Sequence, residues 1–304
     1  MIMKVIIDMD PGIDDAVALS VLLNNKNCQV ELITTVAGNV TVDKTTKNAL
    51  KIANFFNSEV PLAAGASQPL VKAFEDAARI HGESGMEGYD FPEGNSHLLK
   101  QPAVEAWHDV LNKTEKKITL ILTGSYTNFA LWYREYPEDV LKIERVIVMG
   151  GSLSGGNMTS AAEFNVFTDP EAAKILLSSN LSVTMIGLDV TLKALVDRDW
   201  IQKVAALNES GKMLAALISH YNDWHADGWP IHDVNTVAYL LHPEFYSSKK
   251  LWVDIATDGP AIGETVADIR AAYHQGRTNA TVATDIDADA FRNWLKQEIS
   301  SMTR

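Results

Sequence analysis

Four aspartates fall within eight positions near the start of the chain and constrain what the surrounding residues can form. Asp8, Asp10, Asp14 and Asp15 follow directly on an apolar, β-branched run at residues 5–7. A short run of this kind predicts a buried strand, and the Pro-Gly pair after the second aspartate predicts a tight turn. The apolar residues that come next predict a helix that starts at the third and fourth aspartates. The segment is therefore interpreted as a strand, a turn and a helix with acids around the turn.

These carboxylates admit two interpretations, helix capping and metal binding. An aspartate at a helix start stabilises free backbone N–H groups by typically about 1 kcal/mol. Capping needs only one aspartate, however, and four carboxylates so close together would repel one another unless a cation or shared protons lay among them. Clustered oxygen ligands suit calcium or magnesium, and open α/β sheets bind ligands at the carboxyl ends of their strands. We therefore favour a metal site at this turn.

Apolar runs alternate with helical patterns along most of the chain. Strands are predicted at residues 30–36, 60–63, 118–123, 145–149 and 182–188, and helices at 43–57, 102–111, 199–208, 211–225, 232–241 and 287–299. This alternation favours an α/β fold with a mainly parallel, doubly wound open sheet flanked by helices. Residues 251–256, 265–270 and 280–284 instead alternate like strands of a small antiparallel C-terminal appendage. No linker interrupts the pattern, so residues 1–304 are predicted to form a single domain.

Composition limits the classes of partner. A net charge of −13 argues against nucleic-acid polymers and anionic membranes, which both demand concentrated Lys and Arg. No apolar run approaches the roughly 20 residues of a membrane span. Cys28 is the only cysteine, so an internal disulfide is excluded and a reducing, cytoplasmic location is expected. The charge also favours a neutral small molecule over a phosphorylated one.

Further short motifs follow the aspartates in a fixed order along the chain. They are DMDPGIDDA at residues 8–16, TVAGN at 35–39, HGESG at 81–85, TG at 123–124, MGG at 149–151, EFN at 163–165, DPEA at 169–172 and HD at 232–233. Together they resemble the inosine-uridine-preferring nucleoside hydrolases, a family of calcium-dependent enzymes. The resemblance covers almost the whole chain, and the ordered set is far more specific than any one motif.

The resemblance implies hydrolysis of the N-glycosidic bond of purine or pyrimidine ribonucleosides to free base and ribose, in nucleoside salvage or catabolism. It implies a calcium ion bound by Asp10, Asp15, Asp233 and the backbone carbonyl of Thr123. It also implies a homodimer or homotetramer.

The same resemblance assigns roles to residues around that ion. Asp10 would be the general base that activates water, and His232 the general acid, since an imidazole with a pKa near ~6.5 can protonate a departing base at neutral pH. His81 would contact the nucleobase or relay a proton. The remaining substrate-binding residues are Asp14 at the ribose 2-hydroxyl, Asn39 and Asn165 at the ribose hydroxyls, Asn157 and Glu163 at the 5-hydroxyl, and Met149 and Phe164.

Some assignments keep alternatives. Asn39 and Asn165 could serve only as turn residues, and His232 could be a structural histidine. Asp8 is interpreted as a buried carboxylate that supports the site without binding substrate. Just before His232 the chain departs from the family pattern: Trp224, His225 and Trp229 occupy the region expected to frame the base. The preferred base, and the choice between ribose and deoxyribose, therefore stay open.

Two other functions fit part of the pattern. A haloacid-dehalogenase-like phosphatase would use Asp8 and Asp10 around magnesium, but it needs a downstream lysine and a second acidic pair placed elsewhere. A non-enzymatic calcium-binding module would need neither His232 nor the motif at residues 163–165. Phosphorolysis would require a basic cluster for phosphate, which the sequence does not contain.

Overall fold

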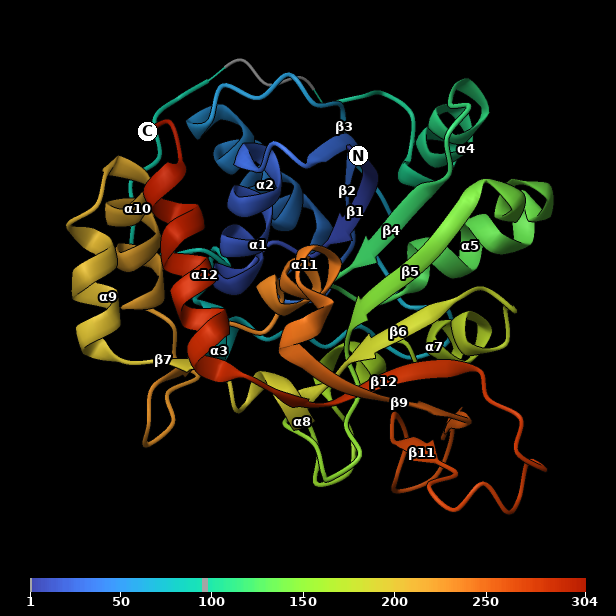
Figure 1. The fold of residues 1–304 in the computed structure, drawn as a ribbon. Helices are drawn as coiled ribbons and strands as arrows, with labels where there is room; N and C mark the ends of the chain where they lie inside the picture. The colour runs from blue at the N-terminus through green and yellow to red at the C-terminus, as the bar shows by residue number, and fades with distance from the viewer. Residues whose placement is uncertain (1, 95–97) are drawn as a thin grey trace.

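An eight-stranded sheet runs through the molecule (Figure 1). The structure is a computed structural model that describes residues 2–94 and 98–304. The sheet is parallel apart from its last pair, in which one edge strand runs antiparallel to its neighbour. Its strands, in spatial order, are β3 (Leu62–Ala64), β2 (Cys28–Thr35), β1 (Met3–Met9), β4 (Ile118–Leu122), β5 (Ile143–Met149), β6 (Val183–Ile186), β12 (Ala280–Ile286) and β9 (Tyr246–Leu251).

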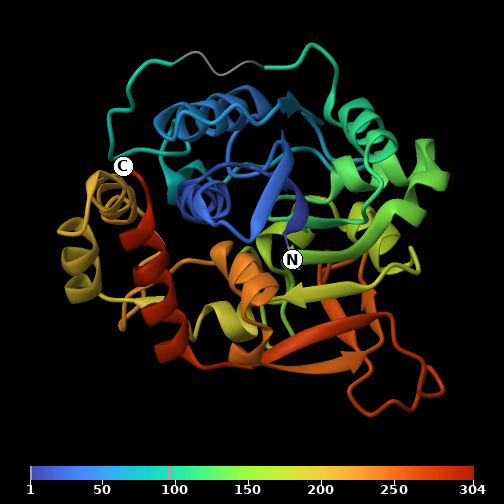
Figure 2. The same cartoon turned by 45° about the horizontal axis from the view of Figure 1, so that its top comes forward.

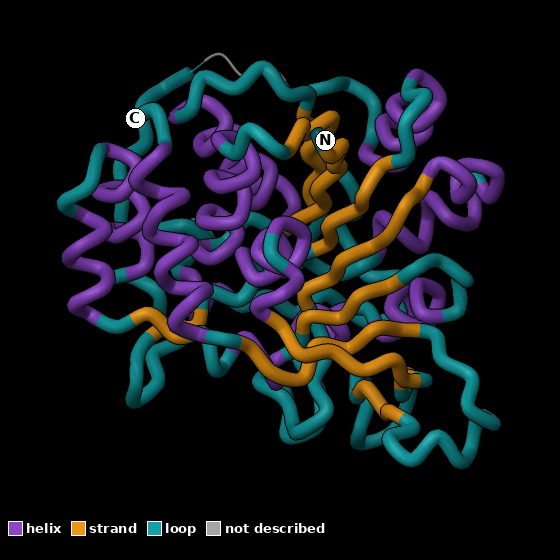
Figure 3. The backbone as a smooth tube through the Cα atoms, in the orientation of Figure 1, coloured by secondary structure: helices purple, strands orange, loops and turns teal. Residues whose placement is uncertain are grey.

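Helices cover both faces of this sheet (Figures 2 and 3). Each face has its own apolar core. Side chains alternate between the faces along each strand, so Ile7 enters one core and its neighbour Ile6 the other. The first core includes α1 (Ile13–Asn24), α2 (Val42–Phe55), α9 (Arg198–Ala205), α10 (Glu209–Ile218), α11 (Val234–Leu241) and α12 (Ala288–Ser301), and the second includes α4 (Ala103–Lys113), α5 (Thr127–Glu135) and α7 (Pro170–Leu177).

The predicted α/β class is confirmed, with helices on both faces of a mostly parallel sheet. Within the described residues, no helix has both the length and the apolar character needed to cross a membrane. Short elements complete the fold: α3 (Ala78–His81), α6 (Phe164–Thr168), α8 (Leu188–Thr191), η1 (Pro137–Lys142), η2 (Pro243–Phe245), and the strands β7 (Leu195–Val196) and β8 (Trp229–Pro230).

The C-terminal strands differ from the prediction. Of the three strands predicted there, β10 (Val253–Ile255) and β11 (Thr265–Ala267) do form a separate antiparallel pair. The third predicted strand, β12, lies in the central sheet, parallel to β6 and antiparallel to β9. Strand β9 has no apolar pattern that would predict it, because its inner residues, Ser247 to Lys250, are exposed at the sheet edge. Lysines are a common protection of such edges.

The helix predicted at residues 211–225 is also partly wrong. Helix α10 ends at Ile218, and residues 219–228 form a connection to β8. In this connection the backbone N–H groups of His225 and Gly228 each donate to the carbonyl of the other residue. Aspartate and asparagine at positions 222–223 favour such local structure over a helix interior. The error matters because this connection contributes to the pocket described below.

We predict that Val282→Ala on β12 lowers the free energy of unfolding by about 1–3 kcal/mol, because Val282 is completely buried in the second core. Val266→Ala on β11 is the matched control. Val266 is 48% exposed, so its loss should stay within about 0.5 kcal/mol. Urea unfolding followed by circular dichroism measures both. Equal losses would contradict the placement of β12 in the central sheet.

Candidate active site

A pocket lies where the carboxyl ends of the central strands meet. Asn39 follows β2, Asp10 follows β1 and Thr123 follows β4, so a parallel sheet brings these three distant positions together. Eleven of the predicted site residues line the pocket: Asp14, Asn39, His81, Thr123, Met149, Asn157, Glu163, Phe164, Asn165, His232 and Asp233. The other two, Asp10 and Asp15, are buried beneath it.

A cluster of buried carboxylates forms the floor. One oxygen each of Asp14, Asp15 and Asp233 lie within 4.8 Å of one another. Asp15 also caps α1, because its Oδ2 accepts the Gly12 N–H at 2.9 Å, while its Oδ1 accepts the Thr123 hydroxyl at 2.9 Å. Capping and participation in the cluster thus coexist in one residue. The structure adds Asp14 to the predicted set of possible metal ligands.

Asp10 lies next to this cluster and is held by tight packing. Its Oδ2 accepts the Asn39 N–H at 2.6 Å, and a Cβ at Gly38 would overlap that carboxylate. Its Oδ1 is buried and has no hydrogen-bond partner among the described residues, and the same holds for Oδ1 of Asp14. Buried carboxylate oxygens normally have partners, so two orphaned oxygens, on Asp10 and Asp14, beside the two further acids Asp15 and Asp233 fit a bound cation.

Burial and mutual repulsion change the acidity of this group. Burial, with the Asp14 charge, raises the pKa of Asp15 to about 7. Burial and the charge of Asp15 raise the pKa of Asp10, and burial and the charge of Asp14 raise the pKa of Asp233. Without a cation the carboxylates must therefore retain protons near neutral pH. An all-oxygen set of this kind suits a hard divalent ion.

Asp8, directly before this group on β1, faces away from it. Its Oδ1 accepts the Thr34 hydroxyl at 2.6 Å and the Asn128 amide at 2.8 Å. It does not line the pocket. This position agrees with the supporting role predicted for Asp8.

The amide side chains predicted to bind ribose are fixed by hydrogen bonds. Asn39 Nδ2 donates to Oδ2 of Asp15 at 3.2 Å, and Asn165 Nδ2 donates to the Thr123 carbonyl at 2.8 Å. Glu163 caps α6: its Oε1 accepts the Asn165 N–H and its Oε2 the Gly151 N–H. Asn157 Oδ1 accepts the backbone N–H of Phe164 at 3.0 Å. These polar groups are thus held in place before any ligand arrives.

The two histidines differ in charge. Burial lowers the pKa of His81, and its Nδ1 accepts the Ile13 N–H at 3.2 Å, so His81 is a neutral ring at the start of α1. Burial also lowers the pKa of His232. The hydrogen bond to Asp223 and the negative charge of Asp14 outweigh this effect, so the pKa of His232 is raised. His232 is therefore the better proton donor at neutral pH.

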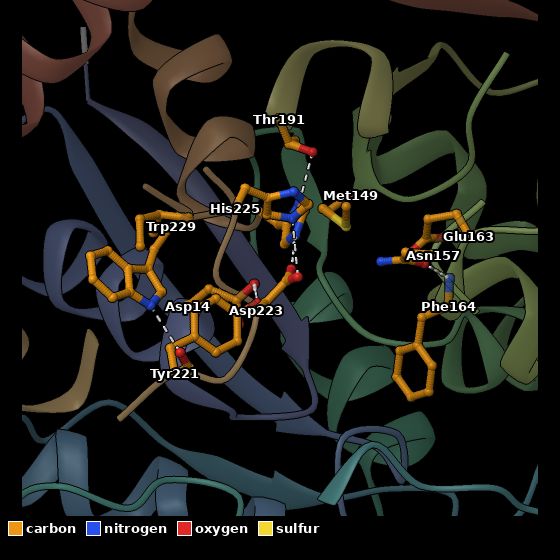
Figure 4. A network of polar contacts seen from close by, with 12 residues as sticks. Asp14, Met149, Asn157, Glu163, Phe164, Thr191, Tyr221, Asp223, His225 and Trp229 are labelled. Atoms are coloured by element: carbon orange, nitrogen blue, oxygen red, sulfur yellow. Dashed lines mark hydrogen bonds and ion pairs between the residues drawn. The ribbon is translucent and has the colours of Figure 1, made fainter. Parts of the chain in front are cut away.

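Several pocket residues were not predicted. Tyr221 and Asp223 come from the connection between α10 and β8, which the sequence had favoured as helix. The three residues expected to frame the base do not line the pocket. Trp224 is 58% exposed, Trp229 donates from Nε1 to the Tyr221 carbonyl, and His225 contacts Asp223. Figure 4 shows Asp223 and Tyr221 on one side and Asn157, Glu163 and Phe164 on the other.

Chelator-treated protein should lose stability as the pH rises from about 4 to 7. In this window the folded state keeps the Asp15 proton, with its pKa near 7, whereas the unfolded chain releases it near 3.8, so the folded state binds more protons. Asp15→Asn should flatten this slope. Melting temperatures at pH 5 and pH 8 without divalent ions measure the effect, and identical slopes in the two proteins would refute it.

Comparison with known proteins agrees with this geometry. A sequence model described as inosine-uridine preferring nucleoside hydrolase matches residues 5–293. The chain is 46% identical over 300 residues to the non-specific ribonucleoside hydrolase RihC of Klebsiella pneumoniae subsp. pneumoniae, with 98% of each chain covered. It is 44% identical over 297 residues to the protein of the same name from Salmonella paratyphi B, with 97% of each covered.

Solved structures give the same picture. The purine-preferring ribonucleoside hydrolase from Gardnerella vaginalis superimposes with a TM-score of 0.91 at 31% identity, covering 98% of both chains. The plant nucleoside hydrolase PpNRh1 also gives a TM-score of 0.91, at 27% identity, covering 98% of this chain and 99% of that one. With its family motifs gathered around one pocket, the chain belongs to the inosine-uridine preferring nucleoside hydrolase family and is a nucleoside hydrolase.

Proposed function

We propose that the protein is a calcium-dependent hydrolase of purine and pyrimidine ribonucleosides that releases free base and ribose in nucleoside salvage or catabolism. The observation that carries this proposal is the pairing of a buried carboxylate cluster with His232, a proton donor, in one pocket. Hydrolysis of a glycosidic bond needs a base for water and an acid for the leaving group. The names of the Klebsiella and Gardnerella relatives support ribonucleosides as substrates.

Asp10, Asp15, Asp233 and the carbonyl of Thr123 would hold the calcium ion, with Asp14 beside them. When bound, calcium would supply positive charge that binds ribose hydroxyls and makes a water more acidic. The all-oxygen donors and the orphaned oxygens of Asp10 and Asp14 support this assignment.

The chain's own groups would carry the proton transfers. The water adds to C1 of the ribose and gives its proton to Asp10, while the electron pair of the glycosidic bond leaves with the base. His232 donates a proton to that base, and His81, at the end of α3, contacts it. Asp14 accepts from the 2-hydroxyl, and its negative charge favours the oxocarbenium-like transition state.

The remaining residues would hold the sugar. Asn39 and Asn165 bind the ribose hydroxyls, and Asn157 and Glu163 bind the 5-hydroxyl. A carboxylate has about four acceptor positions, so Glu163 can accept a hydroxyl in addition to its backbone partners. Met149 and Phe164 would pack against the substrate from the same side.

The position of Asp8 weakens the phosphatase alternative, because a nucleophile would have to face the pocket and Asp8 is bonded to Thr34 and Asn128. Among the described residues that line the pocket, Arg79 is the only Lys or Arg. That supports water over phosphate as the attacking group. A single 304-residue domain, a homodimer or homotetramer, and a cytoplasmic location remain predictions.

Removing divalent ions should abolish base release, and adding calcium should restore it, because Asp10, Asp15 and Asp233 cannot all ionise without a cation. The assay follows free base released from inosine, uridine, cytidine and adenosine. Full activity after verified ion removal would refute the metal assignment. Activity restored by magnesium but not by calcium would show that the site uses magnesium instead of calcium.

We further expect His232→Ala to slow hydrolysis of inosine or uridine by about 10²–10⁴-fold, the usual contribution of a general acid. Hydrolysis of p-nitrophenyl riboside should be largely spared, because its leaving group is already a stable anion. The ratio of kcat/KM between the two substrates is the measurement. Equal losses on both substrates would assign His232 a structural role only.

A further inference from the structure

Both ring nitrogens of His232 are bound by side chains of other elements. Nε2 lies 3.1 Å from Oδ2 of Asp223, and Nδ1 lies 2.7 Å from the hydroxyl of Thr191 on α8 (Figure 4). A carboxylate can only accept a hydrogen bond, so Nε2 must carry hydrogen whether or not the ring is charged. Asp223 lines the pocket and Thr191 does not, so Nε2 is the nitrogen on the pocket side.

Asp223 is itself held in place. Its other oxygen, Oδ1, lies 3.1 Å from Nε2 of His225, so each carboxylate oxygen has one histidine partner. The connection that carries it is anchored at two further points. Asn222 N donates to the Ile80 carbonyl at 3.1 Å, and Trp229 Nε1 donates to the Tyr221 carbonyl at 2.9 Å.

We propose that Asp223 is a positioning residue for His232, which fixes the hydrogen on Nε2 and holds that N–H at the pocket wall until the departing base shares it. The inference rests on the proposed role of His232 as general acid. An acid or base oriented by a third group is a recurrent arrangement in enzymes. Here the third group comes from the segment that departs from the family pattern, and no motif pointed to it.

The chemistry of the carboxylate distinguishes this role from simple packing. In Asp223→Asn the amide can donate to Nε2, which favours hydrogen on Nδ1, the nitrogen facing away from the pocket. The variant keeps nearly the same shape, so a purely structural Asp223 would tolerate it. Asp223→Glu keeps the carboxylate but changes its reach.

The test compares these variants on inosine and on p-nitrophenyl riboside. Asp223→Asn should lower kcat for inosine by about 10–100-fold, a part of the full contribution of a general acid, with little change in KM. Its activity on p-nitrophenyl riboside should stay near that of the wild type, which also verifies the fold. Asp223→Glu should recover part of the inosine rate. Asp227→Asn is the matched control, because Asp227 is exposed in the same connection and does not line the pocket.

His232→Ala separates failure of this inference from failure of the proposed function. If His232→Ala is selective for inosine but Asp223→Asn is not, the positioning role is overturned and the acid role stands. Unchanged inosine turnover in Asp223→Asn, or equal losses on both substrates, would also overturn the inference. If His232→Ala itself lacks selectivity, the acid assignment has failed.

Discussion

The repulsion among buried carboxylates is the constraint on which the site depends. Asp10, Asp14, Asp15 and Asp233 lie within one buried region, and no lysine is among the described residues that line the pocket above them. Such a group is tolerated only if a cation or protons neutralise it, and the raised pKa of Asp15 expresses that cost. The same property makes the region a binding site for a hard divalent ion. The same repulsion that makes the four carboxylates unfavourable to bury therefore also enables them to bind a cation.

The fold separates this anionic floor from a proton donor. The floor is built from the carboxyl ends of β1 and β4, the first turn of α1 and the start of α11, which packing on both sheet faces holds in place. His232 lies next to Asp233 in sequence, yet its ring is held by Thr191 and Asp223 from other elements. The groups proposed to activate water and to protonate the base, Asp10 and His232, are therefore held in place by contacts from different segments.

Much of the architecture was predictable because it depends on local pattern. The apolar runs that became β1, β2, β4, β5 and β6 are buried on both faces, and buried parallel strands have a continuous apolar signature. β9 lacked that signature, since a solvent-exposed edge strand needs no apolar side chains in its middle. The position of β12 in the central sheet could not be predicted from the sequence either. A strand can pair with any free edge, and only the tertiary structure shows that β12 pairs with β6 and places Val282 in the second core.

The sequence by itself determined the acid-rich turn, the α/β class and the ordered motifs, because those features depend on residue type and short spacing. Eleven of the predicted residues do line one pocket. Tertiary structure alone decided that Asp14 joins Asp15 and Asp233, that Asp8 turns away toward Thr34, and that Asp223 reaches His232. Each of these outcomes depends on the direction of a side chain relative to a segment far away in the chain. Local pattern carries no information about such directions, which the packing of helices and strands imposes.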